Sequence, residues 1–286
     1  MDITLGPAAL TQEVLGVEVA ERATPDPWEA ASAEPPYWWA DADRLLFHGD
    51  RARMYVATDR VLLDAPDPAA RAEEDWLLYA TAARALLTFR RRYNLHATIV
   101  VPPDGRAIAI LGESTAGKST TTAELVRRGW GFACDDIAEV AITGEAPTVL
   151  PIERPVHLAD DIAVRLGAEL SDGRPLPMRD KRAYAVSGAD LTPRPLGAMV
   201  VLSALATGAE VEAFPVTPIE GLTTVAASAD RYGICQLPEH RAGFLQWSTA
   251  LCRQVPLWAV RRPPARDSLE EVVDAVVRIA GSAGSA

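Results

Sequence analysis

The feature that most constrains this sequence is a glycine-rich stretch, Gly112-Glu113-Ser114-Thr115-Ala116-Gly117-Lys118-Ser119, which fits the phosphate-binding pattern G-x-x-x-x-G-K-[S/T]. An apolar run, residues 107–111, precedes it, and a helical pattern at residues 120–128, ended by Gly129, follows it. Such a strand, loop and helix point backbone N–H groups and the positive end of a helix at one spot, where Lys118 adds a charge and Ser119 a hydroxyl for Mg²⁺. The stretch therefore predicts a nucleoside triphosphate site, and the alternative is a glycine turn without a ligand. The residues expected to bind the triphosphate are Gly112, Ser114, Thr115, Ala116, Gly117, Lys118, Ser119 and Thr120.

A pair of carboxylates follows the helix. The apolar residues 132–134 read as a strand, and Asp135 and Asp136 come directly after it. A strand that follows a strand and a helix is expected to pair in parallel with the first strand, so that both carboxyl ends lie at one edge of the sheet. We therefore expect the pair beside the glycine loop, and because successive strand residues point to opposite sides, one carboxylate can face a metal and the other an acceptor. The alternative is an aspartate pair that caps a turn.

A histidine and a basic loop are further candidates. Residues 95–101 predict a strand that turns at residues 102–105 into the strand before the glycine loop, which places His96 early in an antiparallel neighbour. A single His beside an apolar strand is usually only packed or solvated. The polar loop at residues 171–182 ends in Lys181 and Arg182 and could neutralise charge on a transferred phosphoryl group, although an ordinary solvated loop fits its composition equally well.

The rest of the chain predicts an α/β protein with an α+β N-terminal part. Residues 1–66 read as short antiparallel strands, in which Trp28, Trp38 and Trp39 are expected to cover a small core rather than to form a ligand platform. A helix is expected from Asp67-Pro68 to about Arg92, and a closing helix starts with the capping box at residues 268–271. The expected divisions are an N-terminal domain, a catalytic domain and a flexible tail. They cover residues 1–94, 95–280 and 281–286.

Composition excludes several classes of protein. A chain of 286 residues is long enough for one large domain or two. A net charge of −11 argues against a protein that coats nucleic acid. The three cysteines lack metal-binding spacing and are an odd number for a disulfide framework, which favours a reducing compartment. Because we find no signal-peptide pattern and no apolar run long enough to span a bilayer, we expect a cytoplasmic protein without membrane or nucleic-acid partners.

Three of these motifs together resemble the catalytic domain of HPr kinase and its relatives. They are His96-Ala97-Thr98, the glycine loop, and the segment Phe132-Ala133-Cys134-Asp135-Asp136. The short spacing from Lys118 to Asp135 is the informative part, because many other P-loop proteins place the metal-binding Asp further along the chain. The motifs lie within residues 95–190, and residues 1–94 show no match. This chain departs from the family pattern at Thr115, where relatives usually have a glycine, and at Thr120, where they have an acidic residue.

The resemblance implies a P-loop kinase fold related to phosphoenolpyruvate carboxykinase, with a mixed sheet flanked by helices, and ATP with Mg²⁺ as the phosphoryl donor. It further implies that one carboxylate of the pair accepts the proton of the attacking hydroxyl and that His96 holds or tunes it. We expect this carboxylate to be Asp135, with Asp136 and Ser119 facing Mg²⁺, although the sequence leaves open which aspartate has which role. Lys118 would bridge the β- and γ-phosphates, and Arg182 would contact the transferred group. Relatives beside peptide natural-product pathways, lasso peptides among them, phosphorylate a precursor peptide on serine. This chain is similar to those, and the family's oligomers suggest a homo-oligomer.

Three hypotheses compete. The leading one is a kinase that transfers the γ-phosphoryl group of ATP to a Ser or Thr hydroxyl of a peptide or protein. The second is a kinase for a small-molecule alcohol, which the sequence does not separate from the first. The third is a non-catalytic, nucleotide-dependent peptide-binding module, and the presence of Lys118, Ser119 and both aspartates counts against it.

Overall fold

The computed structural model groups the chain into two compact units, which are described separately. Unit 1 contains residues 1–92, 176–179 and 230–244, and unit 2 contains residues 93–175, 180–229 and 245–286. The division of the chain at residue 94 into domains remains a prediction. The residues described below are 18–21, 37–49, 52–65, 78–103, 105–113, 115–142, 144, 146–152, 156–165, 170–175, 181–184, 192–206, 208–264 and 266–283. Ser114, Trp28 and the expected helix start at Asp67 lie outside these ranges.

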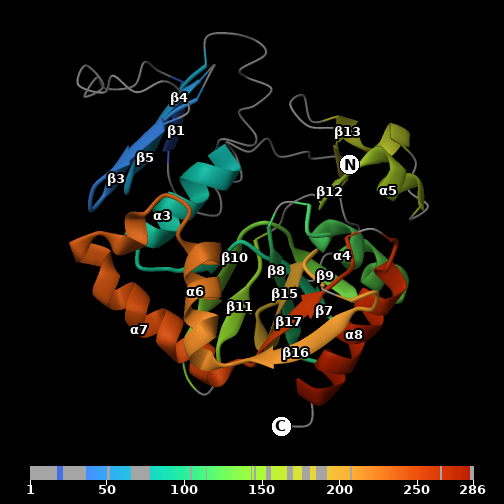
Figure 1. Cartoon of the computed structure of the whole chain (residues 1–286). Coiled ribbons are helices and arrows are strands. Elements are labelled where there is room, and N and C mark those ends of the chain that lie inside the picture. The colour runs from blue at the N-terminus through green and yellow to red at the C-terminus, as the bar shows by residue number, and fades with distance from the viewer. Residues whose placement is uncertain are drawn as a thin grey trace. The chain divides into compact units, whose positions relative to one another are not determined.

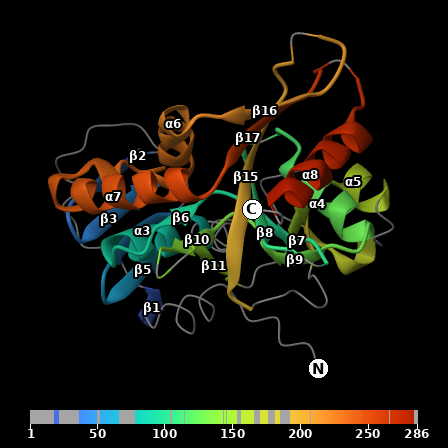
Figure 2. The same ribbon diagram turned by 90° about the horizontal axis from the view of Figure 1, so that it is seen from below.

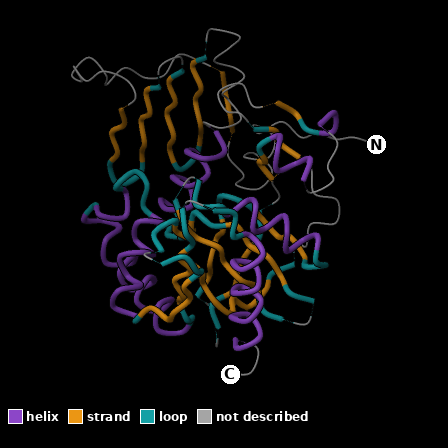
Figure 3. The backbone as a smooth tube through the Cα atoms, turned by 45° about the vertical axis from the view of Figure 1, so that its right-hand side comes forward, coloured by secondary structure: helices purple, strands orange, loops and turns teal. Residues whose placement is uncertain are grey.

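Unit 1 contains a sheet of short strands in the order β1-β5-β4-β3-β2, which lie side by side in Figure 3. The strands are β1 (Glu18–Glu21), β5 (Arg60–Asp64), β4 (Arg53–Ala57), β3 (Arg44–His48) and β2 (Tyr37–Ala40). The pairs among β2 to β5 are antiparallel, as the sequence predicts, and only the β1–β5 pair of this sheet is parallel. The ring of Trp38 packs edge-on against that of Tyr232, with 5.6 Å between the ring centroids. Trp38 and Trp39 are nevertheless 47% and 48% exposed, so neither ring is enclosed in the core.

The helical part of unit 1 starts, within the described residues, with a π-helical turn, η2 (Leu78–Ala82), and continues as α3 (Ala83–Phe89). All of α3 is buried, including the predicted positions Ala83 and Leu87. The helix ends before the three arginines, at Phe89, with Arg90 as its C-cap. Unit 1 also holds η4 (Ile234–Gln236) and the first part of α7 (Pro238–Gln254), a helix whose remaining residues belong to unit 2.

Unit 2 is built on a mixed sheet flanked by helices, as the sequence predicts (Figures 1 and 2). Its strand order is β6-β10-β11-β15-β8-β7-β9, with β17 paired to β15 and β16 paired to β17. The bounds are β6 (Asn94–Leu95), β10 (Ala138–Ala141), β11 (Thr148–Leu150), β15 (Arg194–Ser203), β8 (Ala107–Gly112), β7 (Thr98–Val101), β9 (Gly131–Cys134), β17 (Leu257–Arg261) and β16 (Glu212–Val216). Within this sheet β15 pairs in parallel with both β8 and β17, and the other pairs are antiparallel.

Two helices of unit 2 pack against each other and against one face of this sheet, α4 (Lys118–Arg127) and α8 (Leu269–Ala283) (Figure 2). The core beneath them is apolar and includes Ile110, Leu125 and Val276. A third helix, α6 (Pro218–Ala229), contacts β6. A small sheet of order β12-β14-β13 and the short helices α5 (Asp160–Arg165) and η3 (Leu170–Asp172) complete the unit. The strands of the small sheet are β12 (Val156–Leu158), β14 (Arg182–Tyr184) and β13 (Arg174–Pro175).

The prediction that β9 pairs with β8 was wrong. The strand before the carboxylate pair does not lie beside β8, because β15 and β7 already occupy both edges of β8. Instead β9 pairs with β7 in antiparallel orientation. Since β7 is antiparallel to both β8 and β9, these two strands still run in the same direction and end at the same edge of the sheet. The carboxylate pair therefore lies at the same edge of the sheet as the glycine loop, as predicted.

Two local predictions also differ from the structure. The strand expected at residues 95–101 is broken at His96, because β6 pairs with β10 whereas β7 pairs with β8 and β9. At the start of α8, the expected capping box of Ser268 and Glu271 does not form. Leu269 N donates to Asp267 Oδ1 at 3.1 Å, while Glu271 is engaged by Arg266 at 2.5 and 2.8 Å.

Candidate active site at the glycine-rich loop

The loop between β8 and α4 has positive φ angles at three of its described residues. Gly112 and Gly117 have φ angles of +142° and +101°, and Thr115 has +74°. A Cβ atom on Gly112 would lie 2.6 Å from the carbonyl oxygen of Leu202, so only glycine fits at the end of β8. Helix α4 starts at Lys118 without a side-chain cap. The first N–H groups of a helix have no intrahelical partner, so the loop presents donors and the positive end of a helix dipole.

Lys118 is folded back onto this loop. Its Nζ donates to the carbonyl oxygens of Gly112 at 2.6 Å and of Glu113 at 3.2 Å. The ammonium group is thereby held at the loop. Ser119 and Thr120 lie half-buried in the first turn of α4.

A cavity of about 230 Å³ adjoins the loop. One wall is formed by Thr115, Gly117 and the first turn of α4. The other is formed by the ends of β15 and β17 and by the start of α8, with apolar side chains such as Leu202 and Leu269. The cavity is therefore lined by both apolar and polar side chains, and the glycine loop forms one of its walls.

Arg262 is the cation that faces the loop from the cavity wall. A Cβ atom on Gly117 would lie 4.0 Å from Arg262 Nε. The Arg262 backbone is fixed by its N–H, which donates to Ser203 O at 2.9 Å, and no ion pair or hydrogen bond holds its guanidinium group within the described part of the chain. Arg266, also in the cavity wall, is instead bonded to Glu271 and to Ala209 O.

The carboxylate pair lies where β9 ends. Asp135 is 7% exposed, and its Oδ1 accepts a hydrogen bond from Thr98 Oγ1 at 2.5 Å. Asp136 has a φ angle of +73°, and Ile137 N donates across it to Asp135 O at 2.9 Å. This is the geometry of a three-residue turn with a positive central φ, which is rare and strained. The turn directs the two side chains to different partners.

His96 is the partner of Asp136, not of Asp135 as expected. Its Nε2 lies 2.9 Å from Asp136 Oδ1. The His96 backbone is anchored to the end of α6, because its N–H donates to Ser228 O at 3.0 Å and Ser228 Oγ donates to His96 O at 3.3 Å. The break between β6 and β7 positions this side chain, and a continuous strand would not do so. His96 therefore contacts Asp136 in the structure, and its role toward the carboxylate pair remains a prediction.

Arg182 lies in the small sheet and is held there by local contacts. Its Nε bonds Asp160 Oδ1 at 3.0 Å, and its Nη1 donates to Gly173 O at 3.2 Å. Among the described residues, no group of three or more His, Cys, Asp or Glu side chains is arranged to hold a metal ion. None of the described helices combines the length and apolar character needed to cross a membrane. The catalytic, phosphate-binding and metal-binding roles of the candidate residues remain predictions.

The parallel strands bring the separate parts to one edge of the sheet. The glycine loop follows β8, Arg262 follows β17, Asp135 follows β9, and His96 precedes the antiparallel strand β7. The cavity lies toward β15 and β17, and the carboxylates lie two strands away on the other side of β8, at about 10 Å by strand spacing. The loop thus lies between the cavity and the carboxylate pair.

The sequence predicted no role for Arg262 or for Thr98, although Thr98 belongs to the motif His96-Ala97-Thr98. Arg262 could have been found, because it directly follows the last parallel strand, whose end must lie at the same edge as the loop. Thr98 carries no such signal, since only the register of β7 against β9 places its hydroxyl opposite Asp135.

No protein-family model matches this chain. This chain is 36% identical over 120 residues to the HPr kinase/phosphorylase of Azoarcus sp. (strain BH72). The aligned region covers 42% of this chain and 34% of that protein. The HPr kinase/phosphorylase of Aromatoleum aromaticum is 36% identical over 107 positions, 37% of this chain and 32% of that protein. Part of this chain is homologous to HPr kinase/phosphorylase.

The chain matches only about a third of the length of these curated relatives. The solved structure of the Hpr(Ser) kinase/phosphatase from Coxiella burnetii is similar to 67% of this chain and 95% of that chain, at 12% sequence identity and a TM-score of 0.32. A structural likeness of this size is too weak to define the fold.

Proposed function

We propose that this protein is an ATP-dependent kinase that transfers the γ-phosphoryl group to a Ser or Thr hydroxyl of a peptide or protein, and that a biosynthetic precursor peptide is the acceptor. One observation carries the proposal: a glycine loop lies between a cation-bearing cavity on one side and a pair of carboxylates on the other. The partial homology to HPr kinase/phosphorylase supports it, because those relatives are named as kinases.

The residues present fit a nucleoside triphosphate. The positive φ angles at Gly112, Thr115 and Gly117 leave loop N–H groups available to phosphate oxygens, and Lys118 supplies a charge at the same place. The apolar side chains in the cavity wall, such as Leu202 and Leu269, fit a nucleobase, and Arg262 faces the glycine loop from the same cavity. Arg262 therefore replaces Arg182 in the proposal as the cation on the phosphates, since Arg182 is engaged by Asp160.

The chain's own residues then have distinct tasks. When bound, ATP and Mg²⁺ supply the phosphoryl group and a divalent charge. Lys118 and Arg262 bind and orient the phosphate oxygens, and Ser119 and Asp136 are the proposed ligands of Mg²⁺. Asp135 accepts the proton of the acceptor hydroxyl, because it is a buried carboxylate at the end of β9. His96 holds Asp136 in place through the contact at 2.9 Å.

The test measures phosphoryl transfer from ATP labelled at the γ-phosphate to peptides encoded beside the gene. Each peptide is also made in two variants, one with its serines changed to threonine and one with its serines changed to alanine. The wild type is expected to label the serine and threonine peptides only. Asp135→Asn should lower the rate by about 10²- to 10⁴-fold while ATP still binds, since that is the usual contribution of a general base. Lys118→Ala should weaken ATP binding by about tenfold or more, because it removes a charged contact.

Asp43→Asn is the matched control, since this aspartate is exposed and lies in unit 1. It should leave both ATP binding and transfer unchanged. The proposal fails if the wild type binds ATP but labels no peptide and the Lys118 and Asp135 variants bind ATP as the wild type does. Label that appears only in a small-molecule alcohol would identify the other class of kinase.

A further inference from the structure

Thr98 makes the hydrogen bond that holds the proposed proton acceptor. It is fully buried, and its Oγ1 donates to Asp135 Oδ1 at 2.5 Å. Strand register produces this contact, because Ile99 pairs with Cys134, which places the preceding residue of β7 opposite the residue that follows β9. The register shifts between Ile99 and Val100, so the end of β9 is offset from its earlier part. The irregularity thus aligns the hydroxyl with the carboxylate.

The bond to Thr98 leaves half of the carboxylate available. No donor reaches Asp135 Oδ2 from any described residue, and the only bonded side-chain oxygen is Oδ1. His96, which the resemblance assigned to this task, is occupied with Asp136. A carboxylate that is held through one oxygen and open at the other is oriented without being blocked. This is what a residue needs in order to accept a proton from a positioned hydroxyl.

We propose that Thr98 is the positioning residue for Asp135 in phosphoryl transfer. The inference rests on the proposed kinase function. In the transfer step Asp135 Oδ2 takes the proton of the acceptor hydroxyl, whose oxygen forms the new bond to the γ-phosphorus. The bond from that phosphorus to the bridging oxygen breaks, and its electron pair leaves with ADP. Thr98 touches none of these atoms and acts only through the orientation of Asp135.

The other residues of β7 favour a specific role for this hydroxyl. Strand β7 reads Thr-Ile-Val-Val and all four residues are buried. A β-branched apolar residue would pack equally well at the first position, because valine and threonine have nearly the same shape. The hydroxyl is therefore the only feature of Thr98 that a valine at the same position would lack.

The experiment compares Thr98→Val, which removes only the hydroxyl, with Thr98→Ser, which retains it. Thr98→Val should lower kcat for peptide phosphorylation by about tenfold or more, because it removes part of the contribution that a general base usually makes. The KM for ATP should change by less than about threefold, since Thr98 does not contact the nucleotide. Thr98→Ser should restore kcat to within about threefold of the wild type. Thr88→Val is the matched control, since it removes a buried threonine hydroxyl that bonds Arg84 O in α3. It should leave kcat unchanged.

The decisive arm repeats Thr98→Val in the Asp135→Asn background. If Thr98 acts through Asp135, the double variant should transfer no more slowly than Asp135→Asn alone, because the effects of coupled residues do not add. A loss of the same factor in both backgrounds, or a serine variant as slow as the valine variant, would overturn the inference while leaving the kinase function intact. A wild type that transfers no phosphoryl group would overturn both.

Discussion

Thr115 and Asp136 hold backbone conformations that residues with a Cβ atom rarely adopt. Their φ angles are +74° and +73°, and both lie in the candidate site. The left-handed region costs about 1–2 kcal/mol for such a residue, and it is least favourable for a β-branched side chain such as that of threonine. Strain of this kind clusters at functional sites.

Arg262 leads to a prediction at the same scale. Arg262→Ala should weaken ATP binding by about 10- to 100-fold, because a hydrogen bond to a charged group contributes about 1.5–3 kcal/mol. Arg261→Ala is the matched control. Its guanidinium group stacks on the Phe214 ring at 4.7 Å, and so it is engaged elsewhere. Titration calorimetry with ATP and Mg²⁺ measures both variants. Equal losses in the two would contradict the assignment of Arg262 to the phosphates.

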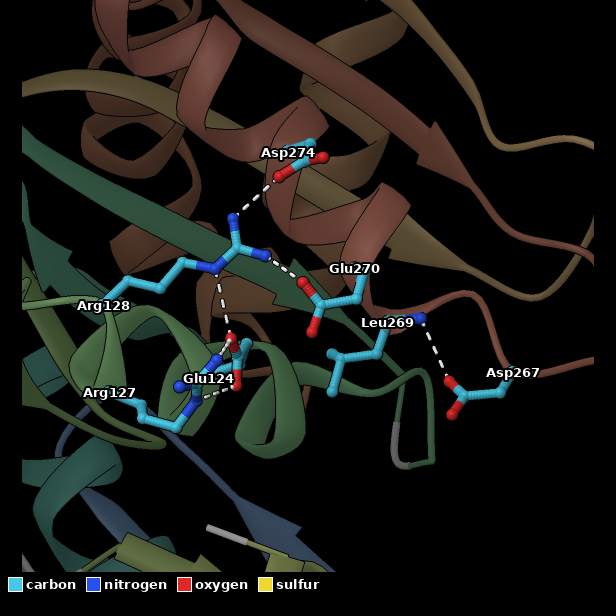
Figure 4. A network of polar contacts seen from close by, with 7 residues as sticks. All are labelled: Glu124, Arg127, Arg128, Asp267, Leu269, Glu270 and Asp274. Atoms are coloured by element: carbon cyan, nitrogen blue, oxygen red, sulfur yellow. Dashed lines mark hydrogen bonds and ion pairs between the residues drawn. The ribbon is translucent and has the colours of Figure 1, made fainter.

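At the scale of elements, the end of α4 is joined to α8 by a network of ion pairs (Figure 4). Arg128 bonds Glu124 at 3.1 Å and Asp274 at 2.7 Å, and it also bonds Glu270. Arg127 donates to the same Glu124 at 2.7 and 2.6 Å. The first turn of α4 forms the glycine-loop wall of the cavity and the start of α8 forms part of the opposite wall. The network therefore connects both walls.

The network predicts a loss of stability in acid. The hydrogen bond from Arg127, followed by that from Arg128, holds the pKa of Glu124 below its ordinary value of 4.5 although burial opposes this shift. A carboxyl group with a lowered folded-state pKa stabilises the protein above its unfolded pKa, and this contribution disappears as the pH falls through the folded-state pKa. Glu124→Gln should lower the free energy of unfolding by about 1.5–3 kcal/mol at pH 7. Its unfolding free energy should also depend less on pH between about 5 and 3 than that of the wild type.

Urea denaturation at a series of pH values measures this prediction. Glu239→Gln is the control, because Glu239 is exposed in the first turn of α7. The control should follow the pH dependence of the wild type. If Glu124→Gln and the wild type lose stability in parallel as the pH falls, the network makes no pH-dependent contribution.

At the scale of the whole molecule, helix α7 belongs in part to each compact unit, and buried cysteines report on both. Cys235 lies in unit 1, whereas Cys134 and Cys252 lie in unit 2, and all three are buried thiols that form no disulfide. Burial, followed by the charge of Asp230, raises the pKa of the Cys235 thiol, and burial raises that of Cys252. Both groups therefore stay protonated and unreactive in the folded protein, because the thiolate is the nucleophile.

These thiols test whether the units unfold together. Because α7 is continuous from Pro238 to Gln254, we expect Cys235 and Cys252 to become reactive toward iodoacetamide at the same urea concentration. Mass spectrometry after pulse labelling at about pH 8 reads each site separately, and fully unfolded chains should label at all three cysteines. Labelling of Cys235 at a lower urea concentration than Cys252 would show instead that unit 1 unfolds by itself.

The chemistry of short segments is enough to predict the glycine loop, the strand before it, the helix after it and the carboxylate pair beyond. It is also enough for the strands around Leu45 and Met54, since their patterns act over a few residues. The order of the strands could not be predicted in this way. The neighbour of β9 depended on which edges of β8 were already paired. No local pattern contains that information.

The sequence by itself determined that the glycine loop and two adjacent carboxylates lie at one edge of the sheet, because strands that run in the same direction end there. Only the tertiary structure decided which residues hold them. Thr98 bonds Asp135 across 37 positions of the chain, His96 contacts Asp136, and Arg262 faces the loop in place of Arg182. The physical reason is register: a shift of a single residue between two strands changes which side chains meet, and long-range packing sets that register.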